Sequence, residues 1–117
     1  MRPVLFVALA VLSGATPAWA HGFLEGAVPA VGSEISEPPR RLVLTFTEGV
    51  EPLFSTIELR DPNGTVVATS KPQTDHGNNR RLIVQLPPLA SGSYTVTWHV
   101  TSVDTHKTEG SFQFTVK

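Results

Sequence analysis

The strict alternation of apolar and polar residues near the end of the chain constrains the fold more than any other feature. The stretch SYTVTWHV (residues 93–100) places Tyr94, Val96, Trp98 and Val100 at every second position. Successive side chains of a β-strand point to opposite faces, so this stretch predicts a strand that is buried on one side. The stretch SFQFTV (residues 111–116) repeats the pattern, and no window shows a sustained helical period.

Further strands are predicted along the chain, separated by segments rich in turn-forming residues. DPNG (residues 61–64) is a strong turn signal, since Pro presets one dihedral angle and Asn-Gly tolerates positive φ. We expect residues 22–41 to be a strand-poor lead-in and residues 71–79 to be a polar loop. About seven short strands at regular spacing predict an antiparallel β-sandwich or barrel. The remaining predicted strands are RLVLTF (41–46), STIELR (55–60), TVVAT (65–69) and RLIVQL (81–86).

The first twenty residues have the pattern of a secretory signal peptide. Arg2 gives a positive start, residues 4–12 form an apolar run, and Ala18-Trp19-Ala20 supplies small residues at the cleavage positions. The apolar run is shorter than the roughly 20 residues that span a bilayer. We therefore expect cleavage after Ala20, export to the periplasm, and a single mature domain over residues 21–117.

The composition of residues 21–117 excludes several classes of function. Without Arg2 the formal charge is −2, against −1 for the whole chain, whereas nucleic-acid-binding domains usually present a basic face. No second apolar segment is long enough to span a membrane, so we expect no stable membrane insertion after cleavage. The chain has no cysteine, so its stability must come from sheet packing and not from disulfides.

Cleavage after Ala20 would leave His21 as the first residue, and a histidine there is an unusual metal ligand. Its free α-amine and its ring Nδ1 can close one chelate ring on a metal ion. An internal histidine cannot do this because its backbone nitrogen is an amide. The reference pKa values of an α-amine and an imidazole, about 7.7–8.0 and 6.5, allow both to act as donors near neutral pH.

Asp104 and His106 form a second candidate group of ligands within TSVDTHKTEG (residues 101–110). On an extended segment, residues two apart project to the same side, so a carboxylate and an imidazole would lie together. With His21 they make a set of three nitrogens and one oxygen. That set suits Cu(II) in tetragonal geometry, while Zn(II) could use the same ligands tetrahedrally. The Irving–Williams order favours Cu(II) in direct competition.

The sequence resembles the CopC family of periplasmic copper-binding proteins over nearly all of residues 21–117. The resemblance lies in HGFLEGAVPAVGSEISEPP (21–39), LVLTFTEGVEP (42–52) and SGSYTVTWHVTSVDTHKTEGSFQFTV (91–116), in that order. It implies a Greek-key β-sandwich, of the immunoglobulin-like or cupredoxin-like barrel type. It also implies a Cu(II) site made by His21, Asp104 and His106, with Glu48 nearby to orient the amine.

The same resemblance implies a protein that sequesters or carries copper, in homeostasis or resistance, and supplies a CopD-type inner-membrane importer. Some members of the family hold Cu(I) in a methionine-rich segment, because thioethers are soft donors. Here the only methionine is Met1 and there is no cysteine. We therefore expect a member that binds Cu(II) alone.

The same residues allow other functions. A small histidine-brace copper oxidase or monooxygenase is the main alternative, but the chain is short and Asp104 would fill a position that oxygen needs. We therefore expect a protein that is not an enzyme. A plain adhesion or binding module would make His21 an accident. His76 and His99 are interpreted as surface histidines that could add a weak second metal site. Ser102, Asp104 and His106 are the residue types of a hydrolase triad, but the sequence shows no nucleophile elbow or oxyanion loop.

Overall fold

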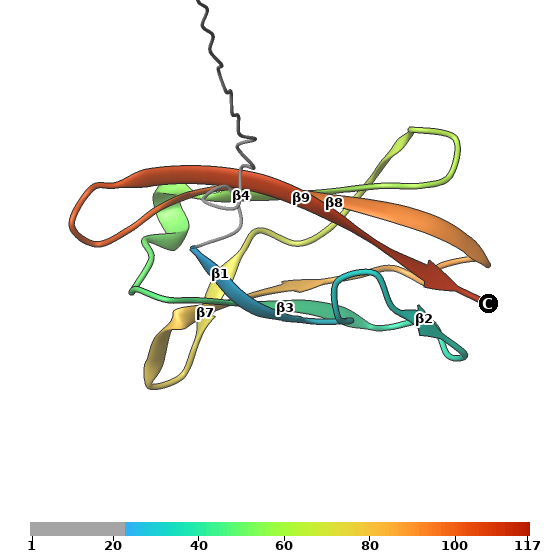
Figure 1. Ribbon diagram of the computed structural model, residues 1–117, viewed down its shortest axis with the longest axis horizontal. Coiled ribbons are helices and arrows are strands. Elements are labelled where there is room, and N and C mark those ends of the chain that lie inside the picture. The colour runs from blue at the N-terminus through green and yellow to red at the C-terminus, as the bar shows by residue number, and fades with distance from the viewer. Residues whose placement is uncertain (1–22) are drawn as a thin grey trace, which may run out of the picture.

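The protein folds as a sandwich of two β-sheets (Figure 1). The computed structural model describes residues 23–117, so the expected signal peptide and His21 lie outside the described residues. One sheet has four strands in the order β1-β3-β7-β6, and the other has five in the order β2-β9-β8-β4-β5. The chain crosses between the sheets five times, at β1–β2, β2–β3, β3–β4, β5–β6 and β7–β8. The all-β sandwich predicted from the sequence is confirmed.

The described part of the chain has nine strands and one short 3₁₀ helix. In the four-stranded sheet the strands are β1 (Leu24–Val28), β3 (Arg41–Phe46), β6 (Gln73–Asp75) and β7 (Asn78–Gln85). In the five-stranded sheet they are β2 (Glu34–Ile35), β4 (Thr56–Arg60), β5 (Val66–Val67), β8 (Gly92–Thr101) and β9 (Lys107–Val116). The 3₁₀ helix η1 (Pro52–Phe54) precedes β4.

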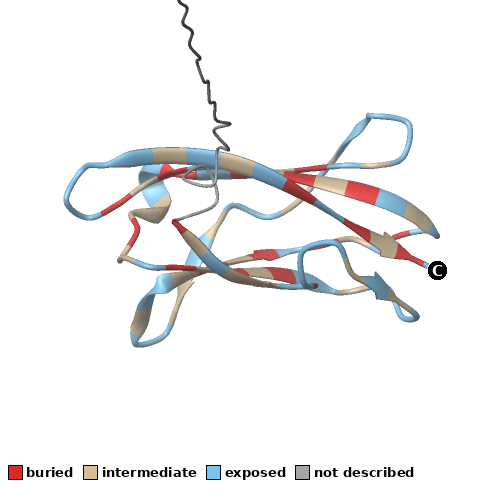
Figure 2. Ribbon diagram, viewed as in Figure 1, coloured by how far each residue is buried: buried red, intermediate tan, exposed pale blue. Residues whose placement is uncertain are grey.

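The core between the sheets is built from the residues that the alternation predicted to face inward. Buried positions alternate with intermediate or exposed ones along β8 and the second half of β9 (Figure 2). Trp98 is fully buried, and its ring meets Phe46 of the other sheet edge-to-face at a centroid distance of 5.4 Å. Tyr94 stacks on Phe114 at 5.6 Å. Such aromatic pairs across and within sheets stabilise the sandwich beyond their buried area.

Three expectations about the strands were wrong. Residues 22–41 hold β1, which pairs antiparallel with β3, and the short β2, which pairs parallel with β9. The segment expected to be a polar loop forms β6 and a hairpin with β7, so nine strands are present where about seven were expected. The missed strands are short or lie at a sheet edge, where few residues need to be apolar.

The two longest strands, β8 and β9, form a hairpin with ten paired positions, from Gly92↔Val116 to Thr101↔Lys107. Its loop, residues 102–106, lies at the end of the sandwich next to η1 (Figure 1). Thr101 Oγ1 donates to the Phe54 carbonyl at 3.1 Å, which ties the base of the hairpin to η1. Within residues 23–117, no helix has the length and hydrophobicity needed to cross a membrane.

Candidate metal centre

The loop that joins β8 to β9 is a tight, hydrogen-bonded turn. The Ser102 amide donates to the His106 carbonyl at 2.8 Å, and the Thr105 amide donates to the Ser102 carbonyl at 2.9 Å. Thr105 has a φ of 73°, a left-handed conformation that is uncommon for a β-branched residue. The extended geometry assumed from the sequence for Asp104 and His106 is therefore wrong. The turn nevertheless brings them together, with Nδ1 of His106 3.3 Å from Oδ1 of Asp104.

Ser102 lies beneath this turn and is fully buried, with 0% of its surface exposed. Its Oγ accepts a hydrogen bond from the His106 amide at 3.0 Å and donates to Oδ1 of Asp104. The bond from Ser102 lowers the pKa of the Asp104 carboxyl and outweighs the opposing effect of desolvation, and the nearby His106 lowers it further. The carboxylate is thus held in its charged, metal-binding form.

Glu48 comes from the segment that leaves β3 and crosses toward η1. The Gly49 carbonyl accepts a hydrogen bond from the Val103 amide at 2.9 Å, which joins this segment to the turn. The Val50 amide donates to the Asn79 carbonyl at 2.9 Å, which joins it to β7. Glu48 is half-buried and directly precedes these two anchors. On its other side the Thr47 amide donates to the Phe23 carbonyl, so the backbone around Glu48 is held on both sides.

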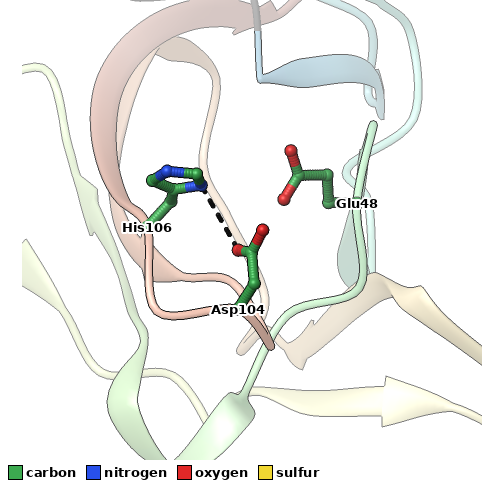
Figure 3. A group of neighbouring side chains, drawn as sticks. All are labelled: Glu48, Asp104 and His106. Carbon is green, nitrogen blue, oxygen red and sulfur yellow. Dashed lines mark ion pairs between the residues drawn. The ribbon is translucent and has the colours of Figure 1, made fainter.

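Glu48, Asp104 and His106 present their donor atoms to a common space (Figure 3). One carboxylate oxygen from each acid and one ring nitrogen of His106 lie within 4.8 Å of one another. The side chains of His106 and Asp104 are 73% and 57% exposed, so an ion can reach them from solvent. Two oxygens and one nitrogen on a firm backbone make a partial metal site with room for further ligands.

The first described residue, Phe23, is held beside this group. Its carbonyl accepts a hydrogen bond from the amide of Thr47, the neighbour of Glu48, at 2.9 Å. Its ring is buried and packs on Phe46 at a centroid distance of 5.5 Å. An extended chain advances about 3.3–3.6 Å per residue, so the Cα of His21 can lie at most roughly 7 Å from that of Phe23. His21 itself lies outside the described residues.

Comparison with known proteins identifies the family. Residues 24–117 match the CopC domain family model. The chain belongs to the CopC family. Protein YobA of Escherichia coli K12 is a relative at 40% identity over 114 residues, which cover 94% of this chain and 92% of the relative.

Two solved structures share the fold. The crystal structure of CopC from Methylosinus trichosporium OB3b has a TM-score of 0.77 and 36% identity, covering 83% of this chain and 94% of the other. The structure of PcoC, described as a methionine-rich copper resistance protein from Escherichia coli, has a TM-score of 0.73 and 29% identity, covering 81% and 97%.

The other two described histidines of this CopC-family chain lie away from the group. His99 is on the outer face of β8, where its Nε2 lies 2.9 Å from Oε1 of Glu109 across the hairpin. His76 lies in the turn between β6 and β7. Among the described residues, the one group with the spacing of a metal site contains neither of them.

From the sequence, Ser102 was considered as a member of a hydrolase-like triad. Its role as a buried support for Asp104 and His106 was not predicted. A catalytic triad needs a serine bonded to the histidine ring, which the carboxylate orients from its other side. Here the Ser102 hydroxyl donates to Asp104 directly, and it is the backbone amide of His106 that donates to Ser102. The geometry is that of a support for two other side chains. The Ser-x-Asp-x-His spacing was the signal available in the sequence.

Proposed function

We propose that this CopC-family chain is a copper-binding protein whose site is completed by its mature amino terminus. The observation that carries the proposal is the convergence of Glu48, Asp104 and His106 within 4.8 Å. The hydrogen bond between Phe23 and Thr47 supports it, because it brings the chain two residues after His21 next to the same group. PcoC, a relative of the same fold, is described as a copper resistance protein.

The proposed ligands are the α-amine and ring of His21, the ring of His106 and the carboxylate of Asp104. Three nitrogens and one oxygen fit Cu(II), whereas Zn(II) with the same set would need a tetrahedral arrangement. In this proposal Glu48 accepts a hydrogen bond from the amine and orients it and is not itself a ligand. Copper is the cargo of the protein.

The oxidation state is proposed from the chemistry of the donors. Thioether and thiolate sulfur stabilise Cu(I), while amine, imidazole and carboxylate favour Cu(II). The chain has Met1 as its only methionine and has no cysteine, whereas the related PcoC is described as methionine-rich. We therefore propose a site for Cu(II) alone.

The proposed location is the periplasm, after removal of residues 1–20. Cleavage after Ala20 would create the α-amine, so the complete site would exist only in the exported protein. Its exposed ligands suit a protein that holds copper for transfer without catalysing a reaction, and we propose a CopD-type inner-membrane importer as the receiver.

The test is a Cu(II) titration read by electron paramagnetic resonance (EPR) on two forms of the protein. One form begins at His21, and the other carries one additional glycine before it. A tight one-to-one, nitrogen-rich spectrum from the first form alone supports the amino-terminal chelate. Equal binding by both forms would exclude the His21 amine as a ligand. Production of peroxide from ascorbate and oxygen, measured on the copper-loaded form, separates a carrier from an oxidative enzyme.

A further inference from the structure

The described residues include two buried polar side chains, Ser55 and Ser102, and both lie at the same end of the sandwich. A buried hydroxyl is costly unless it is hydrogen-bonded, so each must have a structural reason. Ser55 bonds only to backbone: its Oγ donates to the Glu51 carbonyl at 2.7 Å and accepts from the Thr101 amide at 3.2 Å. Ser102 differs, because its partners belong to Asp104 and His106.

The two hydrogen bonds of Ser102 act on different parts of the two candidate ligands. A serine hydroxyl has one proton to donate and two lone pairs that accept. The proton goes to Oδ1 of Asp104 and fixes the direction of the carboxylate, while a lone pair holds the backbone amide of His106. One buried oxygen atom thus fixes the orientation of the Asp104 carboxylate and the position of the backbone from which the His106 side chain projects.

We infer that Ser102 is the positioning residue of the site, which orders Asp104 and His106 before the metal arrives. This inference rests on the proposed function, since it concerns the same site. Both side chains are largely exposed and have little other packing to order them. Without the hydroxyl, binding would have to order the side chain of Asp104 and the turn, and affinity would fall. Loss of a residue that orients metal ligands typically weakens binding by about 10–100-fold.

The test compares Ser102→Ala with Ser55→Ala, which removes a buried serine from the same end of the molecule. In metal-free protein, amide hydrogen exchange and ¹⁵N relaxation at residues 103–106 should show faster exchange and more motion in S102A than in S55A. With copper, affinity measured by competition should fall by about 10–100-fold in S102A and stay near wild type in S55A. The EPR parameters of saturated S102A should also shift, since the ligand geometry is no longer fixed.

Ser102→Thr keeps the hydroxyl and serves as the rescue variant. It should bind Cu(II) within a few-fold of wild type and restore the wild-type spectrum. Equal affinity and identical spectra in S102A and wild type would overturn the inference, as would a threonine variant as weak as alanine. If wild-type protein itself fails to bind Cu(II), the proposed function fails. The metal-free measurements then decide on their own whether Ser102 orders the turn.

Discussion

Ser102 and His106 are joined by two hydrogen bonds at the base of the β8–β9 turn. The Ser102 amide donates to the His106 carbonyl at 2.8 Å, and the His106 amide donates to Ser102 Oγ at 3.0 Å. A fully buried residue therefore holds the backbone of one whose side chain is 73% exposed. This combination gives a fixed backbone and an accessible ring, as a site that exchanges a metal ion requires.

Removal of either candidate ligand in the β8–β9 turn should weaken Cu(II) binding strongly. His106→Ala and Asp104→Ala should each lower affinity by more than about 100-fold, since loss of a direct ligand exceeds the loss of a supporting residue. Affinity is measured by competition with a chelator of known strength. His99→Ala and His76→Ala are the matched controls, and similar losses in all four variants would contradict the assignment.

Glu48 should contribute to copper affinity without being essential. Glu48→Gln keeps the size of the side chain and removes its charge, so a protonated amine or a bound cation nearby would lose an electrostatic partner. We expect affinity to fall by about 10–100-fold, with the number of coordinated nitrogens unchanged in EPR. Glu51→Gln, a neighbouring acid outside the group, is the control. A loss as large as that of His106→Ala would mean that Glu48 is itself a ligand.

Phe23 should affect copper binding although it has no donor side chain, because it anchors the amino terminus. Phe23→Ala removes the packing on Phe46 at 5.5 Å that helps to hold Phe23 beside Thr47. Its copper affinity should fall together with stability. Phe114→Ala, which removes a buried ring stacked on Tyr94, should cost a similar amount of stability, about 3 kcal/mol or more, with copper affinity retained. Affinity and urea unfolding are measured on both, under conditions where each variant is folded.

The metal-free protein should lose stability in acid partly through Asp104. The Ser102 hydrogen bond lowers the pKa of this carboxyl in the folded state, so the folded protein binds its proton less readily than the unfolded chain. The stabilisation is present at pH values above the unfolded pKa and is lost as the pH falls through the folded pKa. Thermal unfolding of wild type and Asp104→Asn should therefore differ at neutral pH and converge in strong acid.

A direct measurement of the Asp104 carboxyl checks the cause of this pH dependence. Carbon NMR of the metal-free protein should show a pKa below the ordinary value for aspartate, and Ser102→Ala should move it back toward that value. An unchanged pKa in the serine variant would assign the lowering to His106 or to the backbone instead.

A side chain at Gly49 should displace the Asn79 side chain of β7, because the chain passes close to that strand there. A Cβ built on Gly49 would lie 2.6 Å from the amide nitrogen of the Asn79 side chain. Asn79 is exposed and the end of its side chain can move aside, so Gly49→Ala should cost less than about 1 kcal/mol of stability, measured by urea unfolding. Gly26→Ala is the control, since its Cβ would meet no atom within 4 Å, and it should stay within about 0.5 kcal/mol of wild type.

The sequence identified the strands that contain fully buried residues and missed β1, β2 and β6, which contain none. β8 and β9 were predictable because a long hairpin buried on one face needs an apolar residue at every second position. β1 was missed because it is an edge strand with Gly26 at its centre and no fully buried residue. The β6–β7 hairpin was missed because its turn residues and exposed polar side chains look like those of a loop.

The candidate site was predictable in its residues but not in its geometry. Asp104 and His106 were chosen for a strand-like spacing, whereas a turn with Thr105 at positive φ brings them together. The positive φ of Thr105 depends on the hydrogen bonds of the turn around it, and the residue types in the segment do not predict it. Glu48 was named from family resemblance alone, because only the crossing between the sheets brings residues so distant in the chain together.

The anchored position of Phe23 also has a mechanical consequence for the proposed site. Phe23 precedes β1 in one sheet, while residues 102–106 end a hairpin of the other. An ion bound by His21, Asp104 and His106 would tie the two layers together and close a loop containing most of residues 21–117. Closing a long loop removes more conformational entropy from the unfolded chain than closing a short one. In a protein without cysteine, the bound copper ion would therefore also act as a reversible cross-link that stabilises the fold. Release of copper would then loosen the end of the sandwich at which the ion was bound.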